Sequence, residues 1–165
     1  MGQLPTSVRR SIVLVRALVA WGVLATALTV LLRDDLVVAW ARGNQAAQEV
    51  LDEGGLEALK SSSIRIPGFA ALTVTFLVVY AALVLVLVAF LRGGHPWSRV
   101  VLTATAAFTS FAIAVGLWRA QPLLFVGLGL VAVGLNAALV WFLWREDTGR
   151  FLHEDVPAAE ALSQG

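Results

Sequence analysis

The side chains that most often carry catalysis or metal binding are scarce in this sequence. The chain has 165 residues and no cysteine, which excludes a disulfide scaffold, a thiolate zinc site and a cysteine nucleophile. Its two histidines, His95 and His153, have no carboxylate or second histidine at metal-ligand spacing, and no phosphate-binding glycine motif or nucleophile elbow occurs. We therefore predict that the protein is not an enzyme, with no catalytic or metal-binding residues and no cofactor.

The residues with the most chemical potential are instead uncharged polar side chains inside long apolar runs. They are Asn136, Tyr80, Thr105, Thr109 and Ser110. Such residues either hydrogen-bond a neighbouring membrane helix, which contributes about 0.6–2 kcal/mol, or line a polar pathway. The threonine and serine hydroxyls can also bond the backbone of their own helix, so they are weaker signals than Asn136. For Asn136 we predict packing: a hydrogen bond to the Thr105 region of the preceding helix. Replacing Asn136 with leucine would then cost no more than about 2 kcal/mol.

The composition indicates the medium in which these residues lie. The chain is 59% hydrophobic and 14% charged, against roughly 45–50% and 25% in ordinary soluble domains. Its mean hydropathy is +0.83, and its net charge of +1 does not favour nucleic acid as a partner. The sequence predicts one integral membrane domain over residues 1–165, with the lipid bilayer as its surroundings.

Four apolar stretches are long enough to span a bilayer, which requires about 20 residues. They cover about residues 11–32, 68–91, 100–118 and 123–144. The runs are continuous rather than alternating, which is typical of helices and not of barrel strands. The connections at 92–99 and 119–122 are short, so we predict an all-α, antiparallel up-down bundle of four transmembrane helices. The first stretch is too long for an ordinary signal peptide and lacks a cleavage site after it.

The polar segments predict a larger loop at residues 33–66 and a polar C-terminal tail at 145–165. The loop has a net charge of −2, and within it Asn44 can cap a short helix that ends at Gly54 and Gly55. Pro67, Pro96 and Pro122 stand where the last three spans should begin.

The distribution of arginine predicts how the chain is oriented. Seven Lys and Arg residues lie on the side of the termini and five on the side of the larger loop. We expect Arg9, Arg10, Arg92 and Arg99, on the side of the termini, to be topology anchors. The resulting prediction is a cell membrane protein with both termini in the cytoplasm and an extracytoplasmic loop. Arg16 lies inside the first span, from which its long side chain can extend to the headgroups.

Four segments carry a resemblance to a known group. They are residues 7–10 (SVRR), 33–37 (RDDLV), 91–102 (LRGGHPWSRVVL) and 144–148 (WREDT). With them the chain resembles small uncharacterised four-span integral membrane proteins common in actinobacteria. One lysine against eleven arginines also fits a GC-rich bacterial genome. The resemblance implies the four-span topology and a bacterial source, and it implies no activity.

Two hypotheses of function follow. In the first, the protein is a non-catalytic multi-pass membrane protein that self-associates or serves as an accessory subunit of a larger envelope complex. Small residues recur at four-residue spacing, as in Ala106, Ser110 and Ala114, and they allow close helix packing within the chain or against a partner. In the second, the protein is a small transporter or channel with a polar pathway near Asn136.

Overall fold

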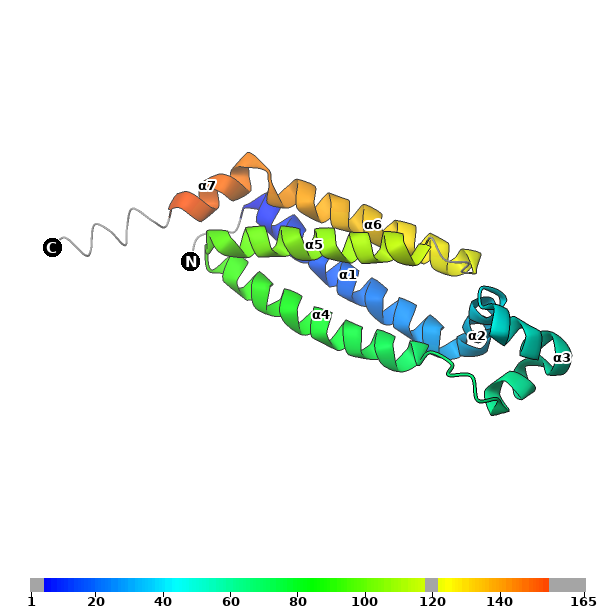
Figure 1. Cartoon of the computed structure of the whole chain (residues 1–165). Helices are drawn as coiled ribbons and strands as arrows, with labels where there is room; N and C mark the ends of the chain where they lie inside the picture. Colours follow the sequence, from blue (N-terminus) through cyan, green and yellow to red (C-terminus); the bar gives the residue numbers. More distant parts are fainter. Residues whose placement is uncertain (1–4, 118–121, 155–165) are drawn as a thin grey trace.

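The computed structural model describes residues 5–117 and 122–154, and every regular element within them is a helix (Figure 1). The helices are α1 (Thr6–Leu31), α2 (Arg33–Arg42), α3 (Gln45–Ser61), α4 (Phe69–Arg92), α5 (Pro96–Leu117), α6 (Leu123–Leu143) and α7 (Glu146–Glu154). Four of them, α1, α4, α5 and α6, are long and apolar enough to cross a membrane. The expectation of an all-helical protein with four such helices is confirmed, and the chain is a multi-pass membrane protein.

The helix bounds follow local sequence signals closely. Proline is the first residue of α5, where its missing N–H removes no helical hydrogen bond. Pro122 is the N-cap of α6, and the carbonyl of Pro67 accepts a hydrogen bond from the N–H of Phe69 at the start of α4. α1 begins at Thr6, earlier than the predicted boundary. Trp118 and most of the predicted turn at 119–122 lie outside the described residues.

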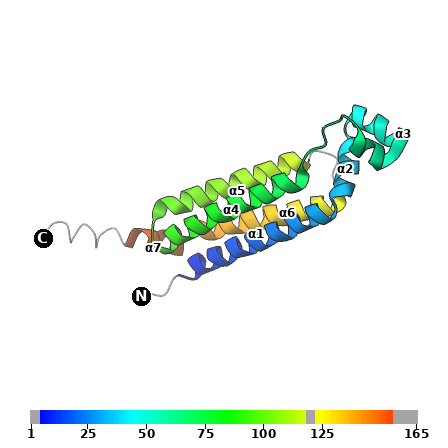
Figure 2. The ribbon, with the colours of Figure 1, turned by 90° about the horizontal axis from the view of Figure 1, so that it is seen from below.

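The four long helices lie side by side, and successive long helices run in opposite directions (Figures 1 and 2). α1 contacts α4 and α6, and α5 contacts α4 and α6, so the four helices enclose a common interior. One end of the bundle carries Ser7, the turn between α4 and α5, and α7; we call it the turn end. The opposite end carries α2 and α3; we call it the loop end.

The hydrophobic core occupies the half of the bundle next to the turn end. Each long helix contributes to this cluster from that half, through Val8, Ile12, Val15 and Leu18 of α1, Val84, Leu87 and Leu91 of α4, Leu102 and Ala106 of α5, and Leu139 and Leu143 of α6. The side chains of this cluster are at most 7% exposed. The half next to the loop end has no comparable cluster among the described residues, so the apolar core is concentrated in one half of the bundle.

α2 and α3 pack against one another at the loop end. Val37, Ala41, Ala47 and Leu59 form their own small apolar cluster. The predicted cap is confirmed, because Asn44 Oδ1 accepts a hydrogen bond from the N–H of Ala47 at 3.3 Å. The predicted end at Gly54 and Gly55 is also confirmed, because the backbone leaves helical geometry at Gly55, with φ of 71°. A second helical segment follows directly and ends at Ser61, and the sequence analysis did not foresee it. The sequence analysis did not foresee α2.

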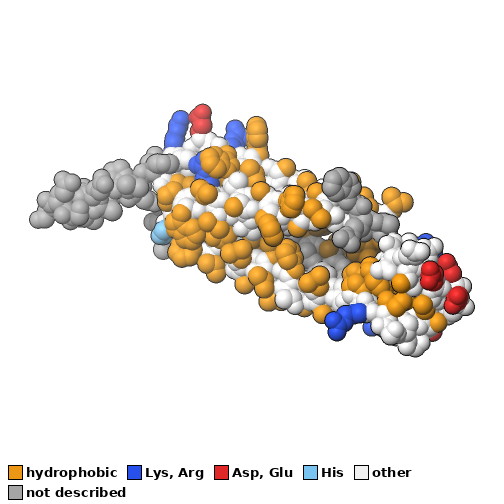
Figure 3. Space-filling view, in the orientation of Figure 1, with side chains coloured by type: hydrophobic (Ala, Val, Ile, Leu, Met, Phe, Trp, Pro, Cys, Tyr) orange, Lys and Arg blue, Asp and Glu red, His pale blue; other side chains and the backbone are white. Residues whose placement is uncertain are grey.

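The described part of the polar tail forms one more helix, α7, which packs against the start of α1. Thr148 and Ser7 are both buried, and Thr148 Oγ1 lies 2.9 Å from Ser7 Oγ and 3.0 Å from the carbonyl oxygen of Phe142. Figure 3 shows apolar side chains over the long helices and acidic side chains gathered at the loop end. This surface matches a bundle that faces lipid along its sides and water at its loop end.

Candidate functional site

Asn136 is the most deeply buried amide side chain in the bundle. It projects from the middle of α6, is 1% exposed, and neither Nδ2 nor Oδ1 has a hydrogen-bond partner in the described part of the chain. The predicted hydrogen bond to the Thr105 region is therefore wrong. Thr105 Oγ1 instead donates to the carbonyl of Val101 in its own helix, at 2.8 Å. A threonine whose hydroxyl donates to a carbonyl four residues earlier in its own helix has no hydroxyl hydrogen left to donate to a neighbouring helix.

Asn136 lines a cavity between the four long helices, which we call the central cavity. Its volume is about 520 Å³, and it extends from Asn136 toward the loop end. Its lining is largely apolar, with aromatic side chains from three helices: Trp21 of α1, Phe76 and Tyr80 of α4, and Phe125 of α6. Such a cavity has the size and lining of a ligand pocket, typically about 300–1,000 Å³.

Small residues account for the presence of this space. Gly22, Ala25, Ala112, Gly116, Gly129 and Ala132 all line it. Where these residues meet a neighbouring helix closely, as at Gly22, an added Cβ would lie 2.9 Å from Leu77 Cδ1. On the third span, α5, small residues therefore face the interior of the bundle in part, since Ala112 and Gly116 line the central cavity. Gly127 and Gly134 differ, because an added Cβ there would meet nothing within 4 Å.

The polar groups of the central cavity gather at its deep end and along its wall. Besides the two atoms of Asn136, Thr26 Oγ1 is a third buried atom without a hydrogen-bond partner among the described residues. Tyr80 and Thr109 also line the cavity, as does Trp21, whose Nε1 donates to the carbonyl of Leu128 at 3.0 Å. Thr26 and Trp21 were not identified from the sequence, because a threonine or a tryptophan in an apolar run does not reveal which way it faces.

A second concave region, the α5–α6 groove, approaches Asn136 from the turn end. It has a volume of about 900 Å³ and runs from Asn136 and Ser110 to Arg145, Glu146 and Asp147. The structure thus brings Asn136, Tyr80 and Thr109 to the central cavity, and Asn136 and Ser110 to the groove. Thr105 lines neither of them. Within the described part of the chain, Asn136 is the one residue that the two regions share.

The arginines predicted to be anchors all lie near the turn end. Arg99 lies over the ring of Trp144, with its Cζ atom 3.9 Å from the centroid, and Arg10 lies over Phe142 at 5.4 Å. Arg9 and Arg92 are exposed. Trp144 Nε1 also donates a hydrogen bond to Thr103 Oγ1, at 3.0 Å. Arg16 is exposed on α1 and lines neither cavity.

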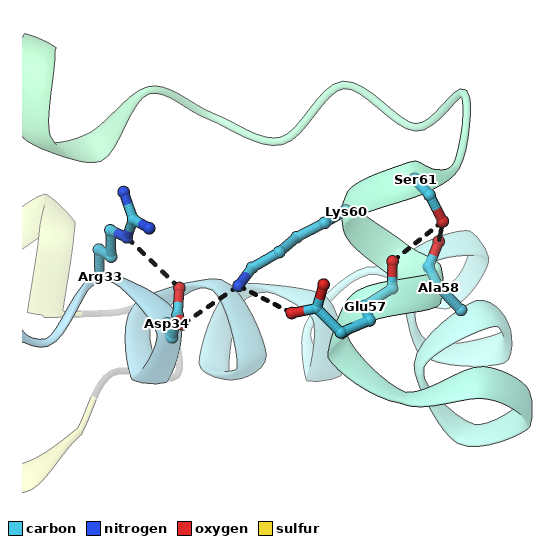
Figure 4. Close-up of polar contacts among 6 residues, drawn as sticks. All are labelled: Arg33, Asp34, Glu57, Ala58, Lys60 and Ser61. Carbon is cyan, nitrogen blue, oxygen red and sulfur yellow. Dashed lines mark hydrogen bonds and ion pairs between the residues drawn. The ribbon is translucent and has the colours of Figure 1, made fainter.

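A charged cluster tethers α3 to α2 at the loop end (Figure 4). Lys60 Nζ lies 3.1 Å from Asp34 Oδ2 and 3.3 Å from Glu57 Oε1. These hydrogen bonds, that to Asp34 above all, raise the pKa of Lys60 above its ordinary value. Arg33 Nε also lies 3.6 Å from Asp34 Oδ1. The cluster is exposed, so salt screens it and it serves as a tether rather than a site.

The raised pKa of Lys60 predicts a pH dependence for this tether. Because folding raises the pKa, the stabilising contribution is complete below the pKa of an unfolded lysine and is lost as the pH rises through the higher folded value. We expect the midpoint of thermal unfolding to fall slightly in that alkaline range at low salt. In the Lys60→Gln variant, the unfolding midpoint should fall less over the same alkaline range. An identical alkaline fall in both proteins would show that Lys60 contributes nothing.

Metal chemistry finds no support in the described residues, which contain no group of three or more His, Asp or Glu side chains able to hold an ion. Comparison of the chain with family models, with curated proteins and with solved structures finds no match. The functional argument therefore depends on the central cavity and on Asn136 at its end.

Proposed function

We propose that this multi-pass membrane protein is a non-catalytic binding protein that holds a small uncharged molecule in its central cavity, within the bilayer. The observation that carries the proposal is Asn136, whose amide lines the cavity and has no hydrogen-bond partner in the described residues. A buried polar group without a partner costs about 1–3 kcal/mol. A ligand that hydrogen-bonds the amide would remove that cost.

The lining also argues for an uncharged ligand. The described side chains around the central cavity include no Asp, Glu, Lys, Arg or His. Burying an ion there would carry a large desolvation cost with no opposite charge to offset it. The same absence of acidic, basic and histidine side chains from the described cavity wall argues against a proton relay.

The test introduces a larger side chain that fills the cavity and measures whether ligand binding is lost. Ala112 and Ala114 are both exposed on α5, but Ala112 lines the central cavity, whereas Ala114 lines neither this cavity nor the α5–α6 groove. A ligand that binds the folded state raises its thermal stability. We expect hexanol to raise the unfolding midpoint of the wild-type protein and of Ala114→Phe, and to raise that of Ala112→Phe by much less. Equal responses of all three proteins would contradict binding in the cavity.

The proposed setting is the cell membrane of a bacterium, with both termini in the cytoplasm and α2 and α3 outside. Support comes from the arginines at the turn end and from the acidic residues over α3. The protein is proposed to act by itself, with a second copy, or as an accessory subunit of an envelope complex. The exposed face of α6 around Gly127 and Gly134 is open enough for another membrane helix to approach.

A second candidate is a small transporter or channel. It is favoured by the position of Asn136 between the central cavity and the α5–α6 groove, which extend toward opposite ends of the bundle. A solute could then pass along both by way of the amide. Uptake of glycerol or urea into liposomes that contain the pure protein, with loss of uptake in Ala112→Phe, would favour this candidate over a binding protein.

A further inference from the structure

The central cavity is closed on three of its four sides by close helix contacts near the loop end. Gly22 of α1 lets Leu77 of α4 approach, since an added Cβ would lie 2.9 Å from it. On α6, Gly129 meets Ile113 of α5 in the same way, at 3.0 Å. The third seam, between α1 and α6, is bridged by the hydrogen bond from Trp21 to the carbonyl of Leu128.

The fourth side, between α4 and α5, is different. Figure 1 shows these two helices together at their shared turn and well apart at their opposite ends. Leu72 and Phe76 of α4 line the cavity and yet are 74% and 47% exposed. Side chains that belong both to the cavity wall and to the outer surface mark an opening. Because α4 and α5 are membrane-spanning helices, this opening faces lipid rather than water.

The deep end of the cavity sets the chemistry of the ligand's polar group. Asn136 presents two N–H donors on Nδ2 and an acceptor on Oδ1, and neither atom has a partner among the residues that the structure describes. A group that satisfies both must donate and accept a hydrogen bond at once. Hydroxyl, carboxamide and protonated carboxyl groups do so, whereas ethers and esters only accept. The aromatic wall formed by Phe76, Tyr80 and Phe125 suits an apolar body behind that group.

We propose that the central cavity takes a single-chain amphiphile from the bilayer, through the opening between α4 and α5. The head of this molecule is uncharged and both donates and accepts a hydrogen bond at Asn136, and its apolar chain lies against Phe76 and Ala112. The inference rests on the proposed binding function and adds to it the class of ligand and its route. A phospholipid tail that enters the same opening without a head at Asn136 is the alternative that the test distinguishes.

The test uses dodecanol with a photoreactive diazirine in its chain, added to the full-length protein in lipid nanodiscs. We expect cross-links on the cavity-lining segments of α4 and α5, and unlabelled dodecanol should compete for them. The methyl ether of the same probe cannot donate a hydrogen bond. We expect it to label these segments about tenfold less, the change that corresponds to losing one good hydrogen bond. Asn136→Leu should reduce labelling by the alcohol to the level of the ether.

Two results would overturn the inference. One is equal labelling by the alcohol and the ether, which would mean that a lipid tail alone occupies the opening. The other is labelling of the exposed α6 face at Gly127 and Gly134 as strong as that of the cavity, without competition. Competition in the wild-type protein requires no variant, so a misfolded Asn136→Leu would not decide the outcome.

The outcome also separates this inference from the proposed function. If hexanol stabilises the protein through the cavity but the long-chain alcohol does not label it, lateral entry of an amphiphile is wrong and the binding function stands. If neither molecule binds, both are wrong.

Discussion

Replacing Asn136 with leucine is expected to increase the free energy of unfolding by about 1–3 kcal/mol, although it removes the most polar side chain of the bundle interior. The amide is 1% exposed and both of its polar atoms lack a partner in the described residues. Leucine has a similar volume and no polar atom to satisfy. The expected sign is thus opposite to that of a packing role, in which the substitution would destabilise the bundle.

The measurement is reversible unfolding in mixed micelles, with the change in free energy compared between variants. Asn44→Ala is the matched control, because Asn44 has a satisfied side-chain oxygen that caps α3, and losing such a cap costs about 1 kcal/mol. Opposite signs for the two asparagines are expected. A clear loss of stability in Asn136→Leu would mean that its amide is hydrogen-bonded in the membrane, and the unpaired-amide argument for a ligand would fail.

Reversing the charge of Arg92 and Arg99 together is expected to change the orientation of the chain. Both residues flank the turn between α4 and α5, and each arginine near an anionic leaflet contributes about 1 kcal/mol. With glutamate at both positions, the bias toward a cytoplasmic turn end falls while the other side keeps its arginines. We expect the double variant to insert in both orientations, or to insert poorly into the membrane.

A single cysteine at position 63 reports the orientation, since the natural sequence has none. Ser63 is exposed, whereas its neighbour Ser62 donates a hydrogen bond to the carbonyl of Leu59. In cells, an impermeant thiol reagent should label this cysteine fully in the wild-type background and only partly in the double variant. Arg42→Glu with Arg65→Glu is the control and should leave labelling complete. Labelling only after lysis in the wild-type background would invert the proposed orientation.

The sequence by itself determined the features that depend on neighbouring residues along the chain. Continuous apolar runs identified the four membrane-length helices, because crossing a bilayer sets a minimum length and composition for each helix separately. Pro96 at the start of α5 and Asn44 at the start of α3 were also predictable, since a helix terminus is satisfied within one turn. The sequence likewise singled out Asn136 as the polar residue to explain.

The tertiary structure decided what surrounds Asn136. Whether its amide meets a partner or a cavity depends on how α6 is rotated about its axis and on how far the helices diverge toward the loop end. Neither quantity is encoded in a local sequence pattern. The same holds for the hydrogen bond between Thr148 and Ser7 and for the ion pair between Lys60 and Asp34, whose members are far apart in the sequence. Apolar side chains fit many arrangements of membrane helices almost equally well, so only their packed shapes determine where a cavity remains.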